Sequence, residues 1–109
     1  MSDGPEVIAQ RLLTLLGDDV VAALLDVSTG EPGRWAIGQE VPNEEYLVKL
    51  ADLDTLAGHL RTAFTPAQAR LWLEGHDAHL NDRPIDVYRR EGSAAVIEAI
   101  RAHEQGAFA

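Results

Sequence analysis

Cysteine is absent from the 109 residues, and its absence excludes disulfide frameworks, cysteine-ligated metal sites and thiol nucleophiles. Basic residues are scarce: 9 lysines and arginines face 18 aspartates and glutamates, giving a formal charge of −9. Such a field repels nucleic-acid phosphates and anionic membranes. The longest apolar run covers only residues 20–25, and the chain begins with acidic residues where a secretory signal would be basic. We therefore expect a cytoplasmic protein that makes no membrane contact.

Alternation of apolar and polar residues at period two is also missing. Apolar residues instead recur at intervals of three and four in several segments, the pattern of amphipathic helices. The sequence therefore predicts an all-α fold, a small multi-helix domain. Its N-terminal region, residues 1–64, has the layout of a degenerate helix-turn-helix, and residues 65–109 form a C-terminal helical region. We expect the two to make one compact unit.

Prolines, glycines and capping residues mark the expected helix ends. A capping box is predicted for Ser28 with Glu31 and another for Thr65 with Gln68. Helices are expected over residues 5–16, from 18 or 19 to 25, after Ser28, over 44–63, 66–74 and 84–91, and from 93 to 106. The apolar residues of the longest helix step by four and three along one seam, which comprises Tyr46, Leu50, Leu53, Ala57, Leu60 and Phe64.

Residues 19–38 resemble a helix-turn-helix, in which Ser28, Thr29 and Arg34 would be the residues to contact DNA. Between residues 18 and 42, however, Arg34 is the only base against five acids. Binding to DNA phosphates needs several basic contacts. We therefore expect DNA binding by this chain alone to be weak, and Trp35 to pack in the core.

Catalytic and metal-binding signals are poor. His76, Asp77 and His79 could supply three metal ligands, but no separate fourth ligand is apparent. Ser28 or Ser93 with a histidine could form a nucleophile pair, yet the sequence has no glycine-rich elbow or phosphate-binding loop. We predict a protein that is not an enzyme, with no metal and no cofactor.

The C-terminal region carries an ordered set of motifs. It begins with Phe64-Thr-Pro-Ala-Gln-Ala-Arg-Leu-Trp72 and a loop ending at Leu80, followed by Arg83-Pro84-Ile85-Asp86 and Gly92. A final helix with Val96, Ile97 and Ile100 precedes a Gly-Ala-Phe-Ala end. In this order and spacing, residues 65–109 resemble the toxin-binding domain of the Xre/MbcA/ParS antitoxin family. The Arg34-Trp35-x-x-Gly38 segment extends the resemblance upstream.

The resemblance implies an antitoxin of a type II toxin–antitoxin system, whose partner is a RES-domain toxin that degrades NAD. The antitoxin would block the toxin's active site, and its acidic field would help to steer a basic partner. Two alternatives stay open: a helix-turn-helix autorepressor that binds DNA alone or with the toxin, and a scaffold protein without a toxin. A homodimer is also possible. The residues assigned to toxin binding are Trp72, Arg83, Pro84, Gly106, Ala107, Phe108 and Ala109.

Two of these assignments carry explicit expectations. Trp72 should anchor the core or the interface, so that Trp72→Ala costs about 3 to 5 kcal/mol if the ring is buried. Gly106 should end the last helix in a left-handed cap, and Phe108 should then insert into the partner. The alternative for Phe108 is a contact with the chain's own core.

Overall fold

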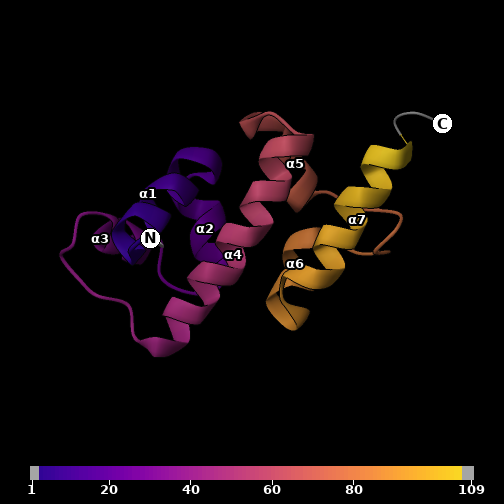
Figure 1. Cartoon of the computed structure of the whole chain (residues 1–109). Helices are drawn as coiled ribbons and strands as arrows, with labels where there is room; N and C mark the ends of the chain where they lie inside the picture. The colour runs from indigo at the N-terminus through magenta and orange to yellow at the C-terminus, as the bar shows by residue number, and fades with distance from the viewer. Residues whose placement is uncertain (1–2, 107–109) are drawn as a thin grey trace.

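The computed structural model describes residues 3–106 of the chain. These residues form seven α-helices and no strand, which confirms the predicted all-α fold (Figure 1). In chain order the helices are α1 (Pro5–Leu16), α2 (Asp18–Leu25), α3 (Glu31–Ala36), α4 (Glu44–Ala63), α5 (Pro66–Glu74), α6 (Pro84–Glu91) and α7 (Ser93–Gly106).

Local sequence signals account for most helix ends. The Asn43 side chain accepts a hydrogen bond from the Tyr46 amide at 3.0 Å and starts α4. The Thr65–Gln68 capping box is confirmed, with both reciprocal bonds formed, at 3.2 and 2.9 Å. Gly92 separates α6 from α7 with a φ of 86°, a conformation that side chains with a Cβ rarely adopt.

One predicted cap residue and one predicted cap conformation are wrong. Gly30, not Ser28, is the N-cap of α3, and Ser28 contributes only its backbone carbonyl, to the Glu31 amide. A helix capped at Ser28 would need an amide hydrogen at Pro32, whereas starting at Glu31 leaves this proline in the first turn, where none is needed. Gly106 is the last residue of α7 and is not in a left-handed cap. Glycine adopts either hand readily, so its presence alone does not fix a left-handed cap.

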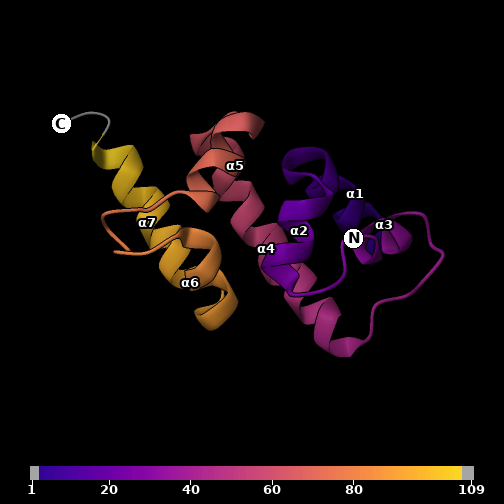
Figure 2. The same cartoon turned by 180° about the vertical axis from the view of Figure 1, so that it is seen from behind.

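The central element is α4, whose most extensive contacts are with α1 on one side and α7 on the other (Figure 1). Figure 2 shows the same arrangement from behind, with α1, α2 and α3 on one side of α4 and α6 and α7 on the other. Within the predicted seam, the four middle residues are buried, but Tyr46 and Phe64 at its ends are only half-buried. Leu56 lies outside the seam and is nevertheless completely buried. Two-sided packing of α4 explains this difference.

The buried side chains form one cluster that draws on α1 to α7. Trp35, on the short α3, is 1% exposed, and its ring centroid lies 5.7 Å from that of Tyr46 on α4. This confirms the prediction that Trp35 packs in the core. None of the helices within residues 3–106 has the length and apolar character needed to cross a bilayer.

Candidate functional site

Three ring side chains meet where α4, α5 and α7 come together. The Phe64 ring stacks on the Trp72 ring of α5, with centroids 5.4 Å apart. It also contacts the His103 ring of α7, with centroids 4.9 Å apart. We refer to Phe64, Trp72 and His103 as the aromatic cluster. Gly106 follows His103 by less than one helical turn, so the last described residue of α7 lies close to this cluster. Ala107, Phe108 and Ala109 lie outside the described residues.

Trp72 also organises the loop between α5 and α6. Its indole N–H donates to Oδ1 of Asp77 at 3.2 Å, and Oδ2 of Asp77 accepts from the Leu80 amide at 3.0 Å. The Asp77 amide donates to the carbonyl of Asp82 at 2.9 Å, which closes the loop. Asp77 therefore serves the loop's structure. Within residues 3–106, no group of three histidine, aspartate or glutamate side chains is placed to hold a metal ion together.

Because Trp72 is half-buried, the cost of Trp72→Ala should be smaller than that of removing a core tryptophan. We expect a loss of about 1.5 to 3 kcal/mol, the value for one aromatic ring leaving a largely apolar contact. Urea unfolding followed by circular dichroism measures it. Leu71→Ala is the control, since Leu71 is the neighbouring residue on α5 and is 74% exposed. Equal stability of the two variants would show that Trp72 contributes nothing to the fold.

Arg83 and Pro84 begin α6. The exposed Arg83 guanidinium makes a two-point contact with Asp86, at 2.8 and 3.2 Å. Pro84 is buried and occupies the first helical turn, so its ring is covered by the fold itself. Of these two predicted toxin-binding residues, only Arg83 offers its side chain to a partner. The Arg83 hydrogen bonds hold the pKa of the Asp86 carboxyl below its ordinary value.

Arg83→Ala is expected to raise the pKa of Asp86, because Arg83 is the main cause of its depression. A carboxyl with a depressed folded-state pKa stabilises the fold above its unfolded pKa and loses that contribution as the pH falls through the folded value. The parent chain should therefore lose this contribution in acid, whereas the variant lacks most of it at neutral pH already. Carbon-detected NMR titration of Asp86 measures the shift, with Arg101→Ala as the control. An unchanged Asp86 pKa would contradict the assignment.

Of the residues predicted to contact DNA, Ser28 and Thr29 lie in the turn before α3 and Arg34 lies on α3. Ser28 and Thr29 are exposed, and the Arg34 guanidinium donates to Glu40 at 2.8 Å. This helix has six residues, of which Pro32, Trp35 and Ala36 are buried. Its one cation is thus already paired with an acid, and half of its side chains belong to the core.

We expect the isolated chain to show no sequence-specific DNA binding. A single paired arginine cannot supply the several phosphate contacts on which even non-specific affinity depends. Electrophoretic mobility shift with DNA from upstream of its gene tests this, with a helix-turn-helix repressor as the positive control. Sub-micromolar, sequence-specific binding at about 0.15 M salt would overturn the expectation.

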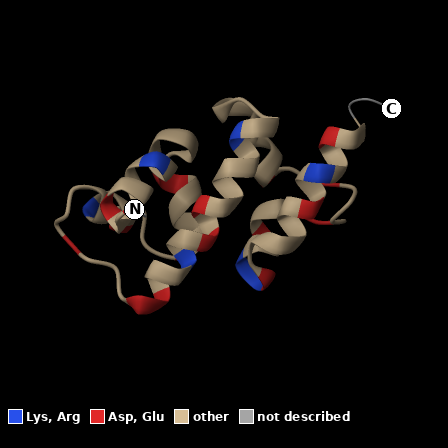
Figure 3. Cartoon of the chain, in the orientation of Figure 1, with Lys and Arg blue, Asp and Glu red and all other residues tan. Residues whose placement is uncertain are grey.

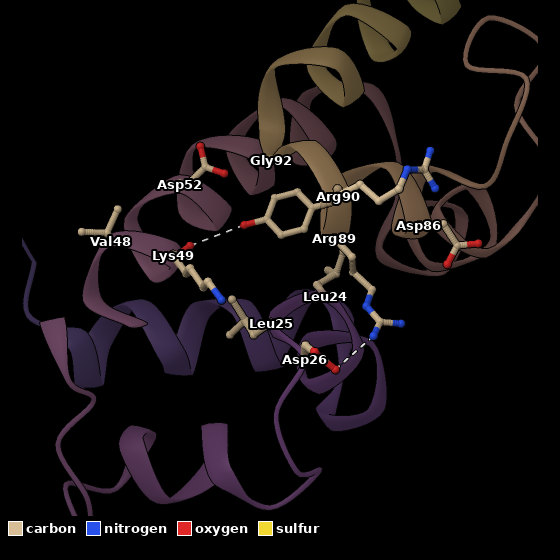
Figure 4. Close-up of a pocket in the computed structure, with 11 residues that line it drawn as sticks. Leu24, Leu25, Asp26, Val48, Lys49, Asp52, Asp86, Arg89, Arg90 and Gly92 are labelled. Carbon is tan, nitrogen blue, oxygen red and sulfur yellow. Dashed lines mark hydrogen bonds and ion pairs between the residues drawn. The ribbon is translucent and has the colours of Figure 1, made fainter. Parts of the chain in front are cut away.

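A groove of about 690 Å³ lies between α2, α4 and α6 (Figure 4). Leu24, Leu25 and Val48 give it an apolar part, and charged side chains surround them. Each of its basic side chains already has a carboxylate partner: Arg89 with Asp26 at 3.0 Å, Lys49 with Glu45 at 3.3 Å, and Arg90 with Asp82 at 3.1 Å. These charges satisfy one another within the fold.

Asp52 and Tyr88 are the residues of this groove that sequence reasoning missed. Asp52 accepts hydrogen bonds from both the amide and the hydroxyl of Ser93, so it caps the start of α7. Ser93, considered above as a nucleophile, therefore donates its hydroxyl to a structural contact. Burial, assisted by the Asp52 carboxylate, raises the pKa of the Tyr88 phenol, which stays protonated. No local pattern announces these contacts, because Asp52 and Ser93 are 41 residues apart in sequence.

Each of the seven described helices contains at least one acidic residue. Figure 3 shows acidic residues on both sides of the molecule, with basic residues between them. Against this background, the aromatic cluster stands out as a surface of rings joined by contacts between three helices. Comparisons with protein-family models, with curated proteins and with solved structures found no match for this chain.

Proposed function

We propose that this chain is an antitoxin of a type II toxin–antitoxin system and that it neutralises a RES-domain, NAD-degrading toxin by covering the toxin's active site. The observation that carries the proposal is the aromatic cluster beside the end of α7. Phe64 contacts both Trp72 and His103, and Gly106 follows His103 by three residues. Trp72 and Gly106, two residues assigned to toxin binding, are therefore near each other in the fold.

The chemistry of this surface suits a protein partner. Aromatic rings that are half-buried and held by their neighbours supply contact area at a small cost in conformational entropy. The exposed guanidinium of Arg83, at the start of α6, keeps further N–H donors besides the two that Asp86 accepts. The net charge of −9 favours association with a basic surface, such as a cleft that accepts the phosphates of NAD.

The test uses the purified RES-domain protein encoded beside the gene of this chain. NAD hydrolysis is measured while the full chain is added, and inhibition that saturates at a fixed molar ratio is expected. The absence of a RES-domain neighbour, or full hydrolysis at a large molar excess of the chain, would overturn the proposal. Trp72→Ala should weaken inhibition by about tenfold or more, as loss of an aromatic hot spot does, whereas Leu71→Ala should not.

A second variant, lacking residues 107–109, separates the two roles considered for Phe108. Lost inhibition with an unchanged melting temperature supports insertion into the toxin. A lowered melting temperature supports a contact with the chain's own core. If neither inhibition nor the melting temperature changes, Phe108 has neither role, and the aromatic cluster remains the proposed binding surface.

A further inference from the structure

A second groove, of about 440 Å³, lies between α1 and the junction of α4 with α5. Four of its residues are apolar, and the remainder are uncharged or basic, with no acid among them. Its lining comprises Val7, Gln10, Arg11, Thr14, Leu15, Arg61, Phe64 and Pro66. An acid-free groove is unexpected in a chain with two acids for every base.

The pairing of the basic residues makes this groove more unusual. Of the nine lysines and arginines, seven form an ion pair with a carboxylate within residues 3–106. The two that form none in that range are Arg61, which lines this groove, and Arg70, which does not. Arg70 donates to the Leu15 carbonyl at 3.1 Å, where a cation suits the C-terminal end of α1. Arg61 is left as an exposed cation at the rim.

The other polar groups of the groove are already engaged. Gln10 donates to the Ala36 carbonyl at 2.8 Å, and Thr14 donates to the Gln10 carbonyl at 2.9 Å. Arg11 pairs with two carboxylates outside the lining, those of Asp3 and Asp54, the latter at 2.9 Å, so its charge is already neutralised. These bonds fix the α1 wall in place. The groove therefore offers one cation without a carboxylate partner in the described residues, Arg61, beside an apolar surface whose neighbouring polar groups are already hydrogen-bonded.

The shape of the groove defines what fits it. Val7, Gln10, Arg11 and Thr14 have the spacing of one helix face, so the α1 wall extends over about 10 Å, two helical turns. Phe64 forms the opposite wall, and its stacking on Trp72 and contact with His103 hold its ring in position. The half-exposed Val7, at 42%, faces the same space.

We propose that this groove binds an amphipathic, acidic helical segment of a partner protein. An apolar side chain of the segment would pack against Val7, Leu15 and Phe64, and a carboxylate one turn away would pair with Arg61. Nucleic acid fits poorly, because a single uncommitted guanidinium provides too few phosphate contacts, whereas one carboxylate of a helical segment needs only one such partner. The groove shares Phe64 with the aromatic cluster. The inference nevertheless goes beyond the antitoxin function, because it specifies the partner's chemistry on the α1 side of Phe64 and holds whichever protein the partner is.

The test uses the full chain and two synthetic helical peptides of roughly four turns. They are identical in their phenylalanine and leucine positions, but one carries glutamates where the other carries lysines. Fluorescence polarisation measures their affinities, and NMR chemical-shift changes of the chain locate the site. The acidic peptide should bind more tightly, with shifts confined to residues 7–15 and 61–66 and extending to Trp72.

Arg61→Glu should weaken binding of the acidic peptide by about tenfold or more, because it puts like charges in contact. Arg61→Ala should give an intermediate loss. Arg101→Glu is the control, since Arg101 is also an exposed arginine but lies on α7, away from the groove lining, and this change should leave binding unchanged. Melting temperatures of all three variants check that the fold is intact.

Several results would overturn the proposal. One is equal affinity for the acidic and basic peptides, and another is unchanged binding by Arg61→Glu. Shifts located outside the groove would also contradict it. Binding that appears only after removal of residues 107–109 would make the chain's own end the occupant, and tighter binding of a labelled RNA at the same residues would favour nucleic acid. Either outcome excludes the acidic protein segment as the occupant.

Discussion

Trp35→Ala is expected to destabilise the chain by about 3 to 5 kcal/mol, the range for truncation of a fully buried aromatic side chain. Trp35 is 1% exposed and packs near Tyr46, so its removal leaves a large void between α3 and α4. Domains of this size have only about 5 to 15 kcal/mol of stability in total. The variant should therefore unfold at a much lower urea concentration and a much lower temperature.

Urea unfolding followed by circular dichroism measures this loss, with Ile37→Ala as the matched control. Ile37 is two residues away and is 75% exposed, so its truncation should change the midpoint very little. A Trp35→Ala midpoint equal to that of the control would mean that α3 is not packed against the core as described.

Leu56→Ala is expected to cost about 2 to 5 kcal/mol, as other truncations of fully buried leucines do. Leu56 is 0% exposed, and its helix is packed between α1 and α7, which limits how far the neighbours can move into the void. Val48→Ala, at a 70% exposed position of the same helix, is the control. If Leu56→Ala unfolds at the same urea concentration as Val48→Ala, Leu56 is not part of the core.

The sequence predicts the helices of this chain well because their ends depend on neighbouring residues. Asn43 accepts a hydrogen bond from the amide of Tyr46, three residues later, and Thr65 and Gln68, also three residues apart, cap each other. The predicted cap residue failed at Ser28 and the predicted cap conformation failed at Gly106, because one residue type is compatible with more than one backbone conformation. There the surrounding fold decides.

The surfaces were harder to predict, because they depend on residues far apart in sequence. Trp72 was recognised from its place in a motif, but its contact with Phe64 requires that α4 and α5 fold back on each other. The contact of Phe64 with His103 joins residues 39 positions apart, and no periodicity encodes it. Likewise, the sequence does not reveal that Arg61 has no carboxylate partner within residues 3–106, because the partners of the other bases are set by the fold.

The Asp52 cap on α7 has a mechanical consequence. A 14-residue helix is about 21 Å long, so a rotation of about 10° at its first residue displaces its last by roughly 4 Å. Such a rotation would occur at Gly92, directly before α7. The Asp52 carboxylate of α4 restrains it by accepting two hydrogen bonds from Ser93, the next residue. The Asp52 hydrogen bonds therefore fix the first residue of α7, and the contact of Phe64 with His103 holds its other end near Gly106, so both ends of this helix are positioned by residues of α4 or directly after it.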